Sequence, residues 1–274
     1  MKAGEIEPLR GLYKNAFNLL IGAQGRGKTY HANELIGRNA QHFDNVLKYA
    51  PGGSAGDFDG DVNDLVDFLQ SRVEHAKRVK DDGRDAQTLM TAIETGRPQF
   101  AIDRGVTLQR MRQLTRDYPS FKEVGRMPET LLLIDDMGGD PAIKRSEAIF
   151  NDVSRRLRHL HLTIIFNAHQ YKDLAPFVRA NSQIVYLHGG LPRRDLQAIT
   201  QERRVPRVRD VRDLETQYLA ATTRDFYGSL PLDFYGKQRD LSSGDREQNA
   251  RSHAEAAHDA VGKGRGVNDD NPTP

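Results

Sequence analysis

The stretch NLLIGAQGRGKTYHANELI, residues Asn18–Ile36, decides how this chain of 274 residues begins its fold. Its apolar run ends at Gly22 and is too short for a helix, which is typical of a buried strand. Two more glycines follow at Gly25 and Gly27, and from Thr29 to Asn39 the apolar residues recur at helical spacing. The stretch therefore predicts a strand, a glycine-rich turn and a helix in direct succession.

The turn in this stretch, GAQGRGKT, fits the pattern G-x-x-x-x-G-K-[ST]. Its glycines allow the backbone to wrap around an anion with its N–H groups turned inward, and the helix adds its positive N-terminus. Lys28 is expected to reach the β- and γ-phosphates of ATP, and the Thr29 hydroxyl to ligate Mg²⁺. An ordinary glycine-rich turn without a ligand is the alternative. The residues expected to line the site are Gly22, Gln24, Gly25, Arg26, Gly27, Lys28, Thr29 and Tyr30.

A second apolar run, Leu131–Ile134, ends in two aspartates. A protein that hydrolyses a nucleotide on such a loop needs an acidic residue at the end of a neighbouring strand. We expect Asp135 to hold Mg²⁺, directly or through water, and Asp136 to polarise the attacking water. The alternative for Asp136 is a cap on the next turn.

A third apolar run, in LTIIFNAHQ, ends in polar residues. In a parallel sheet this strand places Gln170 near the γ-phosphate, beside Asp135 and the glycine-rich turn. A glutamine there senses the phosphate or orients water. The alternatives are that Gln170 is a surface residue and that His169 is the exposed one of the pair.

The remaining pattern indicates an α/β fold with a mostly parallel central sheet and helices on both faces. NVLKYAP and SQIVYLHGG read as further strands, and residues 141–160 as one helix that begins at Pro141. We expect a P-loop NTPase domain over residues 1–235, with a polar insertion of helical patches and loops rich in glycine and aspartate at about 52–127. Residues 236–274 carry almost no large apolar side chains and are expected to be disordered.

Read in order, the three motifs resemble those of the viral DNA-packaging ATPases of the FtsK–HerA superfamily, the poxvirus-type packaging ATPases of large DNA viruses and virophages. In that family an arginine–histidine pair precedes the third strand, a glutamine ends it, and arginine–x–asparagine follows. The resemblance covers roughly residues 18–188 without the polar middle segment, and it departs at FNAHQ, where the family has a more apolar strand end. The matching positions are Arg158, His159, Gln170, Arg179 and Asn181.

The resemblance implies a ring of identical subunits that uses ATP to pull double-stranded DNA into a preformed capsid. Each nucleotide would lie between two subunits, and an arginine of the neighbour would stabilise charge on the γ-phosphate. We expect Arg158 or Arg179 in that role. Arg155 and Arg156 are further candidates, or they simply favour the helix C-terminus. A capsid vertex protein is a further expected partner, and the host cytoplasm, nucleus, virus factory or virion the expected location.

Arginines are dense in LPRRDLQAITQERRVPRVRDVR, residues 191–212. A motor that passes any DNA sequence needs contacts to phosphates and not to bases. These arginines, with Lys144 and Arg145, are candidates for the lining of a ring channel. A solvated surface is the alternative.

Composition excludes some classes of protein. The chain has no cysteine, which excludes disulfides and thiolate metal sites, and it has no apolar run long enough to span a membrane. We therefore expect a soluble intracellular protein without membrane contact, which argues against a secretion or phage-assembly ATPase. The competing functions are an AAA+-like helper or loader ATPase on DNA, a P-loop kinase, and a nucleotide-dependent scaffold.

Overall fold

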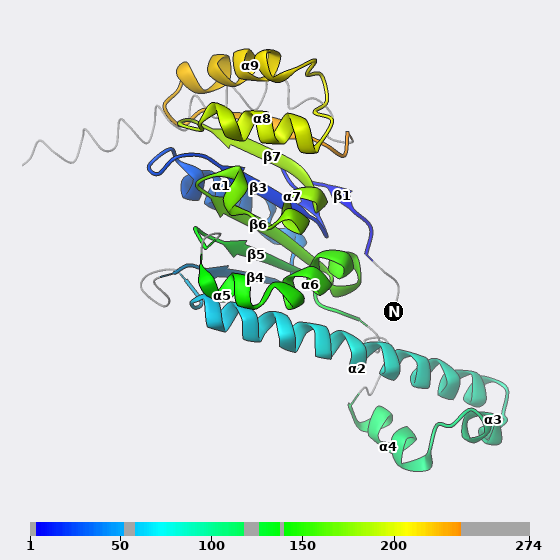
Figure 1. Cartoon of the computed structure of the whole chain (residues 1–274). Helices are drawn as coiled ribbons and strands as arrows, with labels where there is room; N and C mark the ends of the chain where they lie inside the picture. Colours follow the sequence, from blue (N-terminus) through cyan, green and yellow to red (C-terminus); the bar gives the residue numbers. More distant parts are fainter. Residues whose placement is uncertain (1–3, 52–57, 118–125, 138–139, 237–274) are drawn as a thin grey trace, which may run out of the picture. The chain divides into compact units, whose positions relative to one another are not determined.

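The structure, a computed structural model, describes residues 4–51, 58–117, 126–137 and 140–236 (Figure 1). The predicted disordered tail lies outside the described residues apart from Gly236. The described part of the chain contains a six-stranded sheet with the order β4-β5-β6-β3-β7-β8. The predicted α/β class is therefore confirmed.

Five of the six strands are parallel, and the sixth is antiparallel. The antiparallel strand, β8, was not expected and forms one edge beside β7. A separate two-stranded ribbon joins β1 and β2 near the N-terminus. The strands are β1 Glu7–Pro8, β2 Tyr13–Lys14, β3 Phe17–Ile21, β4 Asn45–Tyr49, β5 Thr130–Ile134, β6 Leu162–Ala168, β7 Ser182–His188 and β8 Ser229–Asp233.

Helices cover both faces of the sheet, and each face has its own apolar core. One core joins the sheet to α1 and the N-terminal segment, and the other joins it to α2, α5, α6, α7, α8 and α9. Among the described residues, no helix has both the length and the apolar composition needed to cross a bilayer. The helices are α1 Lys28–Asn39, η1 Ala40–His42, α2 Val62–Glu94, α3 Pro98–Asp103, α4 Leu108–Asp117, α5 Pro141–Arg145, α6 Glu147–Leu160, η2 Tyr171–Asp173, α7 Pro176–Asn181, α8 Arg193–Glu202 and α9 Val211–Thr223.

The position of β6 between β3 and β5 brings the predicted motifs together. Phe166 of β6 pairs with Leu19 of β3 on one side and with Ile134 of β5 on the other. All three strands are parallel, so their carboxyl ends meet at one edge of the sheet. We call it the carboxyl edge, and the opposite one the amino edge.

The loops expected in the polar segment are absent from its first half as far as it is described. Instead α2 runs for 33 residues and passes through Gly83 without a break. Arg110 of α4 forms ion pairs with Asp82 and Asp85 on both sides of this glycine, so tertiary contacts override its poor helix propensity. The first half of α2 packs into the core that joins the sheet to α5–α9, which we call the main core. The far end of α2 instead shares a small separate core with α3 and α4 (Figure 1).

One further expectation needs correction, and one segment forms elements that were not predicted. The helix predicted over residues 141–160 is two helices, α5 and α6, because the backbone leaves the helical region at Ser146 (φ −96°, ψ 18°). Pro141 does begin α5, as expected. No helix or strand was predicted for residues 191–235, yet they form α8, α9 and β8. The regularity of this segment comes from packing on the sheet, to which α8 and α9 contribute buried residues such as Leu196 and Leu214.

Asn18 is a fully buried polar residue and the second residue of β3. Its side-chain oxygen accepts from the Tyr13 N–H at 2.6 Å. Its amide donates to the carbonyl oxygens of Tyr13 (3.0 Å), Ala16 (3.3 Å) and Ile164 (3.3 Å). This side chain therefore fixes the chain that enters β3 and joins it to β6.

We predict that Asn18→Ala lowers the free energy of unfolding by about 2–4 kcal/mol, because several buried hydrogen bonds of about 1 kcal/mol each are lost. Urea unfolding followed by circular dichroism measures this loss. Asn45→Ala, at an exposed position at the start of β4, is the matched control and should leave the midpoint unchanged. Equal stability of the two variants would contradict this role of Asn18.

Candidate active site

The glycine-rich turn, residues 22–27, is bound to the ends of two neighbouring strands. The Gly22 N–H donates to the carbonyl of Ala168 at the end of β6, and the Ala23 N–H to that of Gly189 after β7. Gly25 and Gly27 have φ of 73° and 78°, a region that glycine enters at little cost. At Gly22 a Cβ would come within 2.5 Å of the His188 Cβ, so only glycine fits there. The turn has the shape expected of a phosphate loop.

Lys28 begins α1 at the end of this loop, and no side chain caps the helix N-terminus. Its Nζ donates to the carbonyl oxygens of Gly22 (2.8 Å) and Ala23 (3.1 Å), so the ammonium group lies inside the loop. Burial lowers the pKa of Lys28, while the nearby Asp136 and Asp135 carboxylates raise it. The loop thus combines a buried cation with a helix N-terminus, which suits a polyphosphate.

Asp135 connects three elements at the carboxyl edge. Its Oδ2 accepts from the Thr29 hydroxyl of α1 at 2.9 Å, and its Oδ1 accepts from the Asn167 amide of β6 at 2.8 Å. The Asp135 side chain is buried. The two residues expected to hold Mg²⁺ are therefore in direct contact.

The donor set at this position fits a magnesium ion that is held mainly by its substrate. The described residues contain no group of three or more histidine, aspartate or glutamate side chains suited to a metal. Mg²⁺ is commonly bound by one or two protein oxygens, with phosphates and waters completing its shell. Thr29 and Asp135 supply such a pair of oxygens.

His169 joins Lys28 to Asp136, a link that sequence reasoning did not assign. Its Nδ1 lies 3.2 Å from Lys28 Nζ, and its Nε2 lies 2.8 Å from the Asp136 carboxylate. The ammonium group can only donate, so Nδ1 accepts and the ring proton on Nε2 is donated to Asp136. Asp136 itself has a positive φ of 56°, and its N–H bonds to the Asn167 carbonyl. The polar run after β6 was the available signal, because His169 and Gln170 are adjacent in it.

Gln170 points to a different element. Its Oε1 accepts from Arg194 Nη2 of α8 at 2.7 Å. The strand that precedes it does lie beside Asp135 and the phosphate loop, as expected. A contact of Gln170 with the γ-phosphate stays a prediction.

The two arginines expected to act across a subunit boundary come just before the amino ends of β6 and β7. Arg158 is exposed near the end of α6, just before β6 begins. Arg179 is in α7, just before β7, and its side chain is 14% exposed and paired with Glu202 at 3.0 Å. Its guanidinium also lies over the Tyr171 ring, at 5.3 Å from the centroid. Of the two, Arg158 is the one exposed to solvent.

Three further residues were predicted to line the site, two in the loop and one in the first turn of α1. Gln24 is exposed, and the Tyr30 ring is 51% exposed in the first turn of α1. Arg26 lies over the ring of Phe226, with its guanidinium carbon 4.3 Å from the centroid. Phe226 comes from the loop between α9 and β8, which no motif identified.

A pair of histidines, His188 buried and His31 partly buried, lies behind the phosphate loop and is bonded to it. His31 Nδ1 lies 3.1 Å from His188 Nε2, and His188 Nδ1 lies 3.1 Å from the carbonyl oxygen of Arg26. The carbonyl can only accept, so His188 donates from Nδ1 and accepts from His31 at Nε2. Burial lowers the pKa of His31 to about 3 and that of His188 to about 4. Neutral imidazoles therefore hold the loop to β7.

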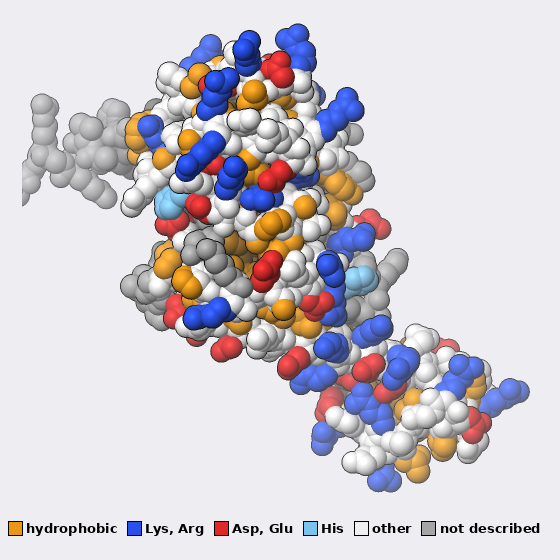
Figure 2. Space-filling model, in the orientation of Figure 1, with side chains coloured by type: hydrophobic (Ala, Val, Ile, Leu, Met, Phe, Trp, Pro, Cys, Tyr) orange, Lys and Arg blue, Asp and Glu red, His pale blue; other side chains and the backbone are white. Residues whose placement is uncertain are grey.

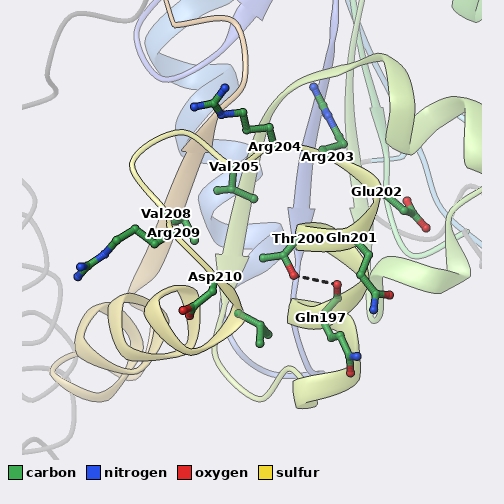
Figure 3. A pocket seen from close by; sticks show the side chains of 11 residues that line it. Gln197, Thr200, Gln201, Glu202, Arg203, Arg204, Val205, Val208, Arg209 and Asp210 are labelled. Carbon is green, nitrogen blue, oxygen red and sulfur yellow. Dashed lines mark hydrogen bonds between the residues drawn. The ribbon is translucent and has the colours of Figure 1, made fainter.

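A hollow of about 550 Å³ lies away from this site, between the end of α8 and the start of α9 (Figure 3). Arg203 there donates to the carbonyl of Ser182, the first residue of β7, which places the hollow toward the amino edge. Its arginines point in different directions in Figure 3 and do not converge on one point. The lining residues are Gln197, Thr200, Gln201, Glu202, Arg203, Arg204, Val205, Val208, Arg209, Asp210 and Val211.

The chain is similar in structure to the genome packaging NTPase B204 from Sulfolobus turreted icosahedral virus 2 in complex with ATP-gammaS, at 15% identity and a TM-score of 0.42. That match covers 81% of this chain and 94% of B204. The cytoplasmic domain of the Thermomonospora curvata Type VII secretion ATPase EccC matches at 14% identity and a TM-score of 0.38, over 66% of this chain. This chain spans about a fifth of that structure, 21%.

A third similar structure is the monomer form of the pCW3 conjugation coupling protein TcpA with ATPgS, at 11% identity and a TM-score of 0.37. It is matched over 64% of this chain and 49% of its own length. No protein-family model matches the chain, and no curated protein is detectably similar in sequence. Since identities are this low, the function has to be argued from the residues of this chain.

We predict that stability falls as the pH drops from 7 to 5. An unfolded histidine of pKa 6.5 takes up a proton in this range, whereas folded His31 and His188 do not. Each histidine then lowers the free energy of unfolding by about 2 kcal/mol at pH 5, because the unfolded state binds more protons than the folded state. Urea unfolding at both pH values measures the loss. The His31→Asn variant should show about half of it, whereas His42→Ala, at an exposed position, should show all of it. A wild type whose free energy of unfolding is the same at pH 7 and pH 5 would contradict the neutral state assigned to folded His31 and His188.

Proposed function

We propose that this chain is an ATPase that moves double-stranded DNA, of the type that packages viral genomes. The observation that carries the ATPase part is the Thr29–Asp135 hydrogen bond of 2.9 Å beside the buried Lys28. This bond joins the hydroxyl that follows the phosphate loop to the carboxylate at the end of β5, which is separated from β3 by β6. Motif order and the position of β6 between β3 and β5 support the DNA-translocating part.

In this proposal, Lys28 exchanges its carbonyl partners for phosphate oxygens when ATP binds. The loop N–H groups and the α1 N-terminus hold the phosphates. Thr29 and Asp135 would hold Mg²⁺, which when bound neutralises charge on the β- and γ-phosphates. Asp136 then accepts hydrogen bonds from the attacking water and orients it.

His169 has a role in the same scheme. It bonds to both Lys28 and Asp136, so a phosphate that draws Lys28 away also removes the donor from the His169 Nδ1. The imidazole is then free to reorient Asp136. In this way, phosphate binding in the loop would change the position of Asp136, the residue proposed to orient water at the carboxyl edge.

DNA contact in this proposal is made through phosphates. Lys and Arg side chains are abundant over α8 and α9 on the face seen in Figure 2, where the arginine-rich stretch lies. Arginine suits sequence-independent contact, because its planar fork matches phosphate oxygens. The side chain of Arg203 is held within the chain by Ser182, so the exposed Arg204 and Arg209 are better placed for DNA than Arg203.

The amino-edge position of Arg158 favours a ring. β6 has seven residues and separates Arg158 from the phosphate loop of its own chain by roughly 20 Å. This distance is too long for an arginine side chain. An Arg158 that completes an active site therefore completes that of a neighbouring subunit.

A helper or loader ATPase acting on a DNA-bound partner is the second candidate. The helices α8 and α9 follow the core, as a small lid would. They pack on the sheet itself and share its main core, which favours the first reading. A capsid vertex protein is the partner expected for a packaging motor, and α3 and α4 offer a separate surface for it.

We predict that Lys28→Ala abolishes ATP binding, whereas Asp136→Asn binds ATP and hydrolyses it about 100-fold or more slowly. Lys28→Ala removes the cation that binds phosphate, whereas Asp136→Asn removes only the carboxylate charge that polarises and orients the attacking water. Calorimetric titration and phosphate release measure the two effects. Asp152→Asn on α6 is the control and should behave as wild type. Wild-type turnover by Asp136→Asn would refute its role.

We predict that Arg158→Ala lowers turnover about 1,000-fold and that mixing it with Asp136→Asn subunits restores activity. In mixed rings an intact active site receives an intact arginine from its neighbour. The same mixture with Arg78→Ala, at an exposed position on α2, is the control, because that variant alone should stay active. Absence of rescue would argue against action in trans.

The proposed function as a whole is tested by ATP hydrolysis with and without long double-stranded DNA at two salt concentrations. We expect DNA to stimulate turnover, and the stimulation to fade as salt weakens phosphate contacts. Turnover that is indifferent to DNA would favour a helper ATPase or a kinase. Absence of any turnover would contradict the ATPase assignment.

A further inference from the structure

The loop between α9 and β8 carries two neighbouring aromatic rings that are exposed to solvent. Phe226 is 57% exposed and Tyr227 is 50% exposed. Their rings meet edge to face, with centroids 5.2 Å apart and an interplanar angle of 87°. Neither ring belongs to the apolar cores of the sheet. Their position therefore needs an explanation other than core packing.

Both rings are seated on the phosphate loop. A Cβ at Gly27 would meet Tyr227 Cδ1 at 2.7 Å, so the Tyr227 ring lies directly against the Gly27 backbone. The Arg26 guanidinium lies over the Phe226 ring, 4.3 Å from its centroid. Gly27 thus serves two purposes, a positive φ and close approach of an aromatic ring.

The loop that presents the rings is held in shape by its own hydrogen bonds. The Asp225 carboxylate accepts from the Tyr227 N–H at 3.0 Å, and the Asp225 carbonyl accepts from the Gly228 N–H at 2.9 Å. At Gly228 a Cβ would lie 2.4 Å from the Ala221 carbonyl, so the loop also packs tightly on the end of α9. The rings are therefore positioned before any ligand arrives.

We propose that Phe226 and Tyr227 form the platform that binds the base of the nucleotide. In a nucleoside triphosphate the base is one ribose and one phosphate away from the β-phosphate, which the loop and Lys28 would hold. Residues that touch Arg26 and Gly27 are thus within reach of the base. Every base has a π-face that stacks on an aromatic ring or on an arginine plane.

Tyr30 supplies a third exposed ring at the same end of the molecule. It belongs to the first turn of α1, two residues after Lys28, and is 51% exposed. The aromatic residues of this region are thus contributed by α1 and by a loop nearly 200 residues later in the chain. The inference rests on the proposed function, because it assumes that a nucleotide occupies the phosphate loop.

The test compares ATP with inorganic tripolyphosphate, which lacks a base, by calorimetric titration of the full chain in the presence of Mg²⁺. We expect Phe226→Ala and Tyr227→Ala each to weaken ATP binding about 10-fold, equivalent to about 1.4 kcal/mol, with tripolyphosphate binding unchanged. Tyr227→Phe keeps the ring and should bind ATP as wild type does. Leu219→Ala, at a 52% exposed position on α9, is the matched control and should change neither affinity.

Four outcomes would overturn the platform. ATP affinity that is unchanged in both alanine variants would show that the rings do not touch the base. Equal weakening of ATP and tripolyphosphate would show that the rings only shape the phosphate loop. Wild type that binds tripolyphosphate as tightly as ATP would exclude a base site while sparing the phosphate site. Wild type that binds neither would refute the proposed function and the platform with it.

Discussion

The Asp135 carboxylate is the interaction on which the candidate site depends. One oxygen accepts from Thr29 of α1 and the other from Asn167 of β6. These bonds tie the end of β5 to the helix that follows β3 and to the strand between them. A buried carboxylate is tolerated only where such donors are present. The same bonds that make its burial possible therefore hold the phosphate loop in register with the acidic strand end.

The second constraint is the set of hydrogen-bond partners of Lys28. Its ammonium group lies on two carbonyls of its own loop and on His169. A buried cation needs acceptors, and burial lowers its pKa. Any phosphate that enters has to replace these acceptors, so binding is coupled to His169 and through it to Asp136. In the proposed function, this link would let a bound phosphate change the position of the Asp136 carboxylate.

Topology separates the functions of the two edges of the sheet. Parallel strands put the phosphate loop, Asp135 and His169 at the carboxyl edge, and put Arg158 at the amino edge. No side-chain movement bridges the length of a strand. A chemical reaction that needs groups from both edges requires a second copy of the chain.

The residues 18–36 and the acidic strand end were predictable from the sequence because their signals are local. A short apolar run, a glycine-rich turn and a helical pattern each depend on neighbours within a few residues, and the parallel class follows from strands alternating with helices. The helix through Gly83 was not predictable, since its stability comes from Arg110 some 30 residues later. The edge strand β8 was missed for the same reason, because its partner β7 lies about 40 residues earlier.

The sequence by itself determined that a phosphate loop and two aspartates are present and which fold carries them. Only the tertiary structure decided which side chains meet there. It placed His169 on Lys28 and turned Gln170 to Arg194. It engaged Arg179 with Glu202 and brought Tyr227 onto Gly27. These choices depend on distances between segments far apart in the chain, and local patterns carry no information about such distances.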